Sequence, residues 1–228
     1  KSSATKEWTL ESRMSLTFEN AKDQFNLLFE KDDYVEDVAN LETGPFSEVT
    51  LAKYDIRNEG QLAVGDDFPS VCVHNSKKDK VLLSDYFNPG RPLVLTFGSF
   101  SWRPWRKKSR VLTAVYEKFH SKVDFLAVYI SEAHAADEWK LYTDVCFDQP
   151  KTIDDRFEIC SKFASRLHGN MEIVVDTMAN EAQDAFSSWP ERLYCVGPDK
   201  KIAYKGALGP DGYLPEEVDA WLSKNVTL

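Results

Sequence analysis

The amino-acid sequence predicts an α/β domain with a central mixed sheet, and the middle of the chain carries that prediction. A short apolar run rich in β-forming residues, Pro92–Phe97, passes through a glycine turn into an amphipathic helix at about 102–120. A second apolar run, Val123–Ile130, follows it. A strand, a helix and a strand of these lengths form a βαβ unit with a right-handed parallel crossover.

The chain before this unit divides into an arm and the start of the domain. Residues 1–45 carry one helical apolar pattern followed by acidic residues, which predicts an N-terminal helical arm and a solvated linker. The domain is predicted to span residues 46–228. It begins with a turn into an edge strand at Ser70–His74, a hairpin turn at Asn75–Lys80 and a helical turn near Ser84–Phe87.

Helices and short strands alternate after the second central strand. A polar insertion precedes a helix at 153–167, which Thr152 and Asp155 are spaced to cap through a capping box. A short strand at Glu172–Val175 and a helix at 179–188 follow.

The chain ends with two strands and a helix. Arg192–Val196 and Lys201–Lys205 are joined by a Gly-Pro-Asp turn, and Pro215 opens the last helix. This order is that of a thioredoxin-like fold of the peroxiredoxin type, with helices flanking the sheet, an N-terminal β and helical extension and one insertion. Pro190 precedes a strand where such folds place a cis-proline, so it is a candidate for a cis peptide bond.

Composition and charge exclude several classes of function. The net charge of -9 disfavours a nucleic-acid or anionic-membrane partner, and no apolar run approaches the roughly 18 residues of a membrane span. We therefore expect a soluble domain, with a membrane anchor possible only upstream of Lys1. The four cysteines form no Cys-x-x-Cys pair and the four histidines no spaced cluster, so neither a cofactor nor a metal is predicted.

The turn after the first central strand holds the candidate site. A thioredoxin-like fold keeps its redox nucleophile there, and this chain has Trp102. An indole offers one N–H donor, no titratable group and no soft nucleophile. The architecture therefore suggests an oxidoreductase, while the residue at the decisive position leaves open whether the chain is an enzyme.

Six segments of the domain resemble the iodothyronine deiodinases, in order and over roughly residues 48–225. They read RPLVLTFGS at 91–99, DFLAVYI at 124–130, EAH at 132–134, DTMAN at 176–180, PERLY at 190–194 and GPDGY at 209–213. The resemblance implies a thioredoxin-like fold and descent from selenoenzymes that remove iodine reductively from thyroid hormones. It also implies a protein anchored in a membrane by an N-terminal helix, and a homodimer.

The resemblance assigns roles to positions of this sequence. The family motif Gly-Ser-Cys-Thr-Sec-Pro-Pro places selenocysteine on Trp102 and the neighbouring cysteine on Phe100. Two polar family positions fall on Pro150 and Leu208. The candidate catalytic positions are thus, in order, Ser99, Ser101, Trp102, Glu132, His134 and Glu191. The candidate substrate-binding positions are Phe100, Trp105, Pro190 and Leu208.

Two of these features have alternative interpretations. His134 is either a proton donor or substrate contact, as in the family, or a loop histidine bonded to Glu132 or to backbone. The helix after Trp102 begins with five cations, which are either a solvated face or a patch for an anion or an acidic partner. They are Arg103, Arg106, Lys107, Lys108 and Arg110.

Three functions remain open. The first is a catalytically impaired deiodinase homologue that binds a ligand, such as an iodinated phenol, or a partner; selenocysteine changes to tryptophan by one base, UGA to UGG. The second is an active selenoenzyme with a misread selenocysteine at residue 102. The third is a thiol oxidoreductase that uses another cysteine, with Cys195 the nearest candidate.

Overall fold

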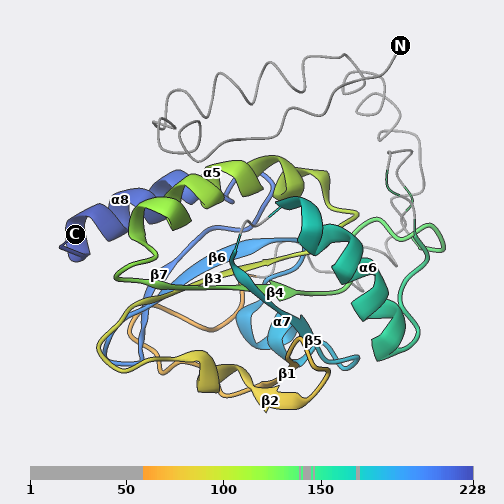
Figure 1. The fold of residues 1–228 in the computed structure, drawn as a ribbon, viewed down its shortest axis with the longest axis horizontal. Helices are drawn as coiled ribbons and strands as arrows, with labels where there is room; N and C mark the ends of the chain where they lie inside the picture. Colours follow the sequence, from red (N-terminus) through yellow and green to blue (C-terminus); the bar gives the residue numbers. More distant parts are fainter. Residues whose placement is uncertain (1–58, 139, 141–144, 146, 168–169, 228) are drawn as a thin grey trace, which may run out of the picture.

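The computed structural model of the chain describes residues 59–138, 140, 145, 147–167 and 170–227 (Figure 1). The predicted arm at 1–45 lies outside these residues, so it stays a prediction. The described chain forms one seven-stranded sheet in the order β2-β1-β5-β4-β3-β6-β7. The strands are β1 Cys72–His74, β2 Lys80–Leu82, β3 Leu93–Gly98, β4 Asp124–Tyr129, β5 Glu172–Asp176, β6 Arg192–Val196 and β7 Ile202–Lys205.

The predicted βαβ unit forms the centre of the sheet. β3 and β4 pair in parallel over their full length, from Leu93 opposite Asp124 to Gly98 opposite Tyr129. Every residue of β3 is buried, which explains its continuous apolar sequence. β6 pairs with β3 in antiparallel orientation, so the sheet is mixed as predicted.

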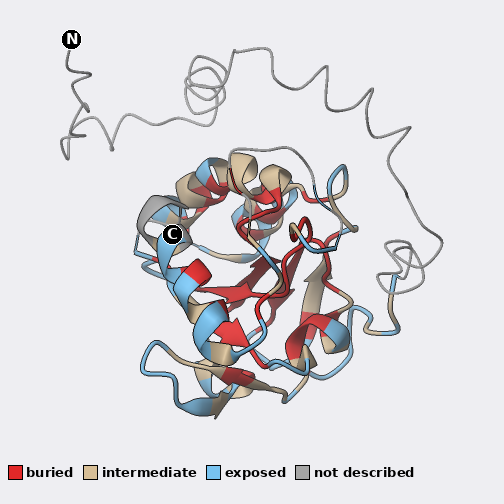
Figure 2. Ribbon diagram, turned by 90° about the vertical axis from the view of Figure 1, so that its right-hand side faces the viewer, coloured by how far each residue is buried: buried red, intermediate tan, exposed pale blue. Residues whose placement is uncertain are grey.

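The helices cover both faces of the sheet, with buried residues concentrated between the layers (Figure 2). α5 (Arg103–Phe119) packs against α8 (Pro215–Asn225) on one face, above the sheet in Figure 1, and it also contacts α6 (Ile153–Leu167). α7 (Glu181–Phe186) packs against β1 and β5 below the sheet. A 3-10 turn, η1, spans Leu83–Tyr86.

Two local predictions are confirmed. The side chain of Thr152 accepts the Asp155 N–H at 3.2 Å, and the Asp155 carboxylate accepts the Thr152 N–H at 2.8 Å, which is the reciprocal pattern of a capping box. The bond between Trp189 and Pro190 is cis. A second cis bond, between Gly209 and Pro210, was not predicted.

Two other predictions need correction. The strand predicted at Ser70–His74 is not at an edge, because β1 lies between β2 and β5, with its fully buried Val73 opposite Asp176. The helix predicted at 179–188 is shorter, because Asn180 and Ser187 adopt left-handed conformations, with φ of 57° and 43°, and bound α7 at Glu181–Phe186.

The turn at 99–102 joins β3 to α5, and we call it the redox turn. A close contact next to this turn fixes the start of α5. The Trp105 indole packs on the backbone of Gly98, where an added Cβ would lie 2.2 Å from the ring. Its N–H donates to the Thr96 hydroxyl at 2.9 Å, and that hydroxyl lies 2.7 Å from the Tyr213 hydroxyl. Only glycine at position 98 leaves room for this arrangement, which joins β3, α5 and the segment before α8.

Candidate functional site

The turn between β3 and α5 is held by the loop that follows β4. The Ser99 hydroxyl accepts the Ala133 N–H at 3.2 Å, and the Ser101 hydroxyl accepts the His134 N–H at 3.1 Å. The carboxyl ends of adjacent parallel strands meet at one edge of the sheet, so both loops converge there. The two serines act on the backbone and position the turn.

Trp102 occupies the N-cap of α5 and is packed inside the site. Its side chain makes no capping hydrogen bond, and the residue is 7% exposed. The indole stacks on the His134 imidazole, with ring centroids 5.0 Å apart and planes inclined by 28°. His134, itself 3% exposed, is therefore covered by the residue at the nucleophile position rather than open to solvent.

Glu132 forms a buried network with the turn. Its carboxylate accepts the Ser101 N–H at 2.8 Å and the Tyr129 hydroxyl proton, and the Tyr129 hydroxyl in turn accepts the Phe100 N–H at 3.1 Å. Burial raises the pKa of Glu132, although the hydrogen bonds from Ser101 and Tyr129 oppose that shift. Burial also raises the pKa of Tyr129 well above its usual value. The glutamate's hydrogen bonds run to Ser101 and Tyr129, so it fixes the turn.

Glu191 is a second buried carboxyl group near Trp102. It follows the cis-proline, is fully buried, and lies against Gly209, where an added Cβ would be 2.3 Å from its Cγ. Burial raises its pKa to about 8, against the lowering influence of the nearby Trp102 indole and of Lys108. Neither carboxyl oxygen has a hydrogen-bond partner among the described residues, so the indole N–H is close without forming that bond. Glu191 is therefore predominantly protonated at neutral pH.

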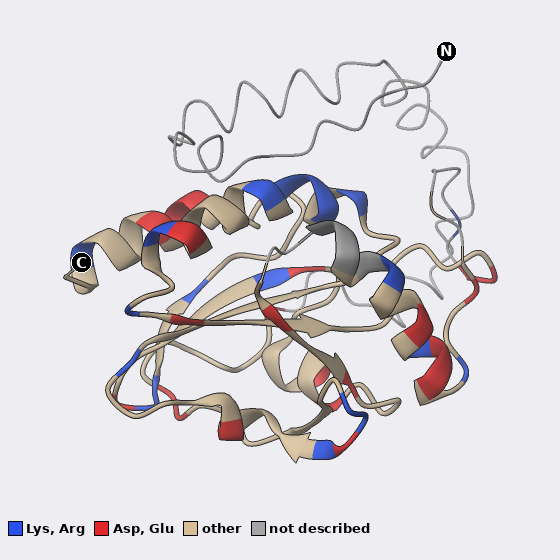
Figure 3. Cartoon of the chain, viewed as in Figure 1, with Lys and Arg blue, Asp and Glu red and all other residues tan. Residues whose placement is uncertain are grey.

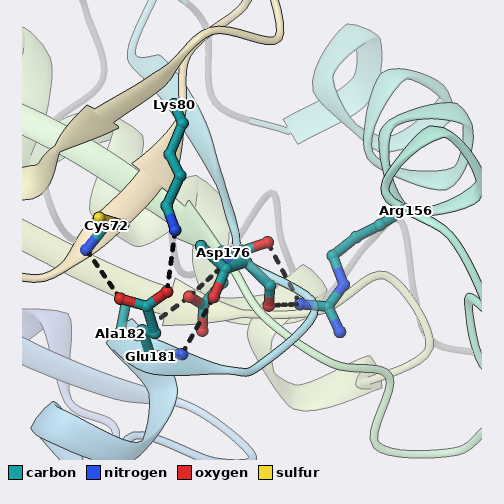
Figure 4. Close-up of polar contacts among 7 residues, drawn as sticks. Cys72, Lys80, Arg156, Asp176, Glu181 and Ala182 are labelled. Atoms are coloured by element: carbon teal, nitrogen blue, oxygen red, sulfur yellow. Dashed lines mark hydrogen bonds and ion pairs between the residues drawn. The ribbon is translucent and has the colours of Figure 1, made fainter.

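Asp176 and Arg156 hold the backbone at the start of α7 (Figure 4). The Asp176 carboxylate accepts the N–H groups of Ala182 and Gln183 at 2.9 and 2.8 Å, which satisfies the start of α7. Arg156 reaches from α6 and donates to the Thr177 carbonyl at 2.7 Å. These contacts hold α7, and with it the chain that leads to Pro190.

The four predicted substrate-binding residues differ in their burial and in the residues that they contact. Trp105 is fully buried in the core, as described above, so its indole is not a wall of the site. Phe100 is 4% exposed and stacks on Phe147 at 5.7 Å. Pro190 is buried beside Glu191, and Leu208 is half-buried, with its carbonyl accepting the Gly212 N–H at 3.1 Å.

Lys108 and Arg106 of α5 make contacts within the structure. Lys108 donates to the carbonyls of Pro210 and Tyr213 at 2.8 and 2.6 Å, and the Arg106 guanidinium lies over the Phe100 ring at 5.5 Å. Figure 3 shows the cations gathered at the N-terminal half of α5. The interpretation as an anion or acidic-partner patch stays a prediction.

Cys160 and Cys195 are not activated thiols, and the third described cysteine, Cys72, lies half-buried in β1. Cys195 is fully buried in β6, and burial raises its pKa. Burial and the Glu132 charge raise the pKa of Cys160 to about 12. Reactive thiolates need a lowered pKa and access to solvent, and these two residues have neither. Cys146 lies outside the described residues.

Sequence reasoning missed several residues that build the site. Tyr129 donates to the Glu132 carboxylate, and Gln149 accepts the Glu132 N–H at 2.8 Å. The sequence could have predicted that Tyr129 lies at the site, because this residue ends the strand next to the redox turn. Within the described part of the chain, there is no group of three potential metal ligands and no helix long and apolar enough to cross a membrane.

Comparison with solved structures defines the class of fold. A protein described as the thiol:disulfide interchange protein DsbE of Chlorobium tepidum matches with a TM-score of 0.51 and 14% identity, over 73% of this chain and 97% of that one. An uncharacterized conserved protein of Geobacillus kaustophilus matches with a TM-score of 0.51 and 18% identity, over 72% and 82% of the two chains. These likenesses show a thioredoxin-like fold.

Sequence comparison then gives the family. A sequence model described as iodothyronine deiodinase matches residues 15–226. Type I iodothyronine deiodinase of Xenopus laevis is 36% identical over 169 residues, which is 74% of this chain and 66% of that protein. Thyroxine 5-deiodinase of Homo sapiens is 36% identical over 142 residues, 61% of this chain and 46% of that protein.

The chain therefore belongs to the iodothyronine deiodinase family. The alignments span between about half and two thirds of the length of these curated relatives.

Proposed function

We propose that this protein is a catalytically impaired member of the deiodinase family that binds a hydrophobic phenol at the redox turn. The observation that carries the proposal is the indole of Trp102 at the nucleophile position, buried and stacked on His134. Reductive removal of iodine through a selenolate needs a soft nucleophile that can accept the iodine. An indole has neither a titratable proton nor a lone pair of that kind.

The packing around Trp102 supports tryptophan as the native residue. The indole stacks on the His134 ring and lies near the carboxyl group of Glu191. Phe100, at the position of the family's cysteine, is packed on Phe147. A misread selenocysteine codon would account for one of these departures and not for the other.

The thiol oxidoreductase has less support. Both Cys160 and Cys195 are buried with raised pKa values, and neither starts a helix. A buried thiol of this kind behaves as a small apolar side chain.

A ligand of the iodinated-phenol class fits the chemistry of the groups that remain. Aromatic side chains from the turn and from the loop before Glu191, among them Trp189 at 7% exposure, supply polarizable surface for a ring. The protonated carboxyl group of Glu191 can donate to a phenol or phenolate oxygen. A homodimer, by analogy with the family, is part of the same proposal and is tested by sedimentation of the purified chain.

Fluorescence titration with thyroxine tests the binding proposal. We expect a saturable change in tryptophan emission that shrinks in Trp102→Phe and persists in Trp221→Phe, because Trp221 lies on α8, away from the redox turn. Thyronine, which lacks iodine, serves as the ligand control and should bind more weakly. No saturable change up to the solubility of thyroxine would refute the binding proposal.

The intact mass of the protein from its natural source distinguishes the selenoenzyme alternative. A mass that contains tryptophan at residue 102 excludes it. A mass that contains selenocysteine there establishes it, and the impaired-enzyme proposal is then wrong.

A further inference from the structure

A cavity lies at the amino ends of the central strands, whereas the redox turn lies at the carboxyl end of β3. It has a volume of about 370 Å³ and is lined by the first residues of β3, β4 and β5, which are Leu93, Asp124 and Glu172. The redox turn follows the last residue of β3, so the two places are separated by the length of that strand, roughly 20 Å at about 3.3 Å per residue. The cavity is therefore not part of the site described above.

Aromatic and apolar side chains line the cavity together with polar ones. Leu93 and Leu126 are each 1% exposed, so they lie behind the surface that a ligand would meet. The walls include Tyr86, Tyr116 and Phe125, of which the last two meet edge to face with centroids 5.3 Å apart. A volume of this size lies in the range of small-molecule sites, which combine apolar walls with a few polar groups.

The charged groups of the lining are acidic. Asp85, Asp124 and Glu172 line the cavity, and no lysine or arginine is among the described lining residues. His120 also lines it and stacks on the Tyr116 ring with centroids 5.2 Å apart. Asp124 is already paired with Arg91 at 2.9 Å and with the Asn88 amide at 2.7 Å. Glu172 is exposed and interacts with the Tyr86 hydroxyl, and Asp85 accepts the Leu82 N–H at 3.2 Å. Neither carboxylate takes part in any of the described ion pairs.

The pKa of the Tyr86 phenol depends on its distance from these carboxylates. Its pKa is raised to about 12, first by burial and then by the charge of Glu172, with a smaller contribution from Asp85. The negative charges are therefore next to the aromatic wall. An aromatic wall beside a carboxylate attracts a cation through its ring face and through the charge together.

We propose that this cavity binds a small organic cation that carries an aromatic ring, such as a protonated arylalkyl amine. The ring would lie between Tyr86, Tyr116 and Phe125, and the ammonium group would lie beside Glu172 and Asp85. The net charge of -9 on the whole chain favours the approach of such a ligand. The proposal stands apart from the proposed function at the redox turn.

Three ligands of nearly equal shape test the proposal by NMR titration of the full chain. They are phenethylamine, which is a cation, phenethyl alcohol, which is neutral, and hydrocinnamate, which is an anion. We expect saturable binding of phenethylamine, weaker binding of the alcohol and at least roughly tenfold weaker binding of the anion. The shifted resonances should lie at the amino ends of β3, β4 and β5 and weaken with added salt.

A charge-matched pair of variants locates the effect. Glu172→Gln should weaken phenethylamine binding by roughly two- to fivefold, in line with the size of exposed charge interactions. Glu158→Gln removes the same charge from an exposed position on α6 that does not line the cavity and should leave binding unchanged. The absence of saturable binding up to roughly 10 mM, equal binding of the three ligands, or equal effects of the two variants would each overturn the proposal.

Discussion

The indole of Trp102 stacks on the imidazole of His134, with ring centroids 5.0 Å apart. The backbone of His134 donates to Ser101, the neighbour of Trp102, at 3.1 Å. The side chain that the resemblance assigns as a proton donor or substrate contact is here one face of an aromatic pair. Both residues of the stack are buried, with 7% of Trp102 and 3% of His134 exposed.

Removal of the indole should therefore cost stability. Truncation of a buried aromatic side chain costs about 3–5 kcal/mol, and we expect Trp102→Ala to fall in this range. In a double-mutant cycle with His134→Ala, a coupling of about 0.5–1.5 kcal/mol is expected from the aromatic contact. Chemical denaturation gives both values, with the half-buried Trp221→Ala as the control that should cost less.

Glu191 predicts an unusual dependence of stability on pH. Its pKa is about 8 in the folded state against an ordinary value of 4.5, so between these values the folded state keeps a proton that the unfolded state has released. The folded state is therefore favoured at low pH, and its free energy of unfolding falls as pH rises from about 4.5 to about 8. The loss by pH 7 is roughly 3 kcal/mol, at about 1.4 kcal/mol for each pKa unit.

The Glu191→Gln variant removes this penalty and keeps the shape of the side chain. We expect it to gain stability over the wild type as pH rises from about 5 to about 7.5, with little difference at the lower value. Glu216→Gln, on the exposed face of α8, should track the wild type. A pH-independent difference between Glu191→Gln and the wild type would show that the carboxyl group is not protonated in the folded state.

The Asp176 contact with α7 predicts a position-dependent loss of stability. Asp176→Ala leaves the N–H groups of Ala182 and Gln183 without their acceptor and should cost about 1–3 kcal/mol. Asp184→Ala, at an exposed position of the same helix, should change stability by less than about 0.5 kcal/mol. Equal losses in urea unfolding would contradict the capping role of Asp176.

A thiol placed at the nucleophile position should be activated by its surroundings. The start of α5 favours a negative charge through its free N–H groups, and cations follow in its first turns. We expect the thiol of Trp102→Cys to have a pKa below about 7.5, measured from the pH dependence of its reaction with iodoacetamide. The wild type, with its half-buried Cys72 and its buried Cys160 and Cys195, gives the background rate. An inflection at or above about 8.5 would show that the turn no longer stabilises an anion.

Local sequence patterns predicted most of the fold. The apolar run of β3, the stripe of α5 and the capping box of Thr152 and Asp155 each depend on residues close in the chain. The position of β1 inside the sheet could not be predicted in this way. It depends on pairing with β5, about a hundred residues away, and a three-residue strand has too little pattern to show on which side it is covered.

Part of the candidate site could also be predicted from local sequence motifs. Family motifs placed Ser99, Glu132 and His134 near Trp102, and the structure brings them together. The fate of Trp105 was not predictable, because the spacing of an aromatic residue does not show whether it faces a cleft or the core. The room left by Gly98 and the hydroxyl of Thr96 decide that it faces the core.

Release of iodide from thyroxine in the presence of dithiothreitol tests the central claim most directly. The protein with Trp102 packed on His134 is predicted to release no more iodide than Trp102→Ala or than a sample without protein. Thiol-dependent release that rises with protein concentration and saturates with thyroxine would contradict the account, because it would require a nucleophile that this site does not contain.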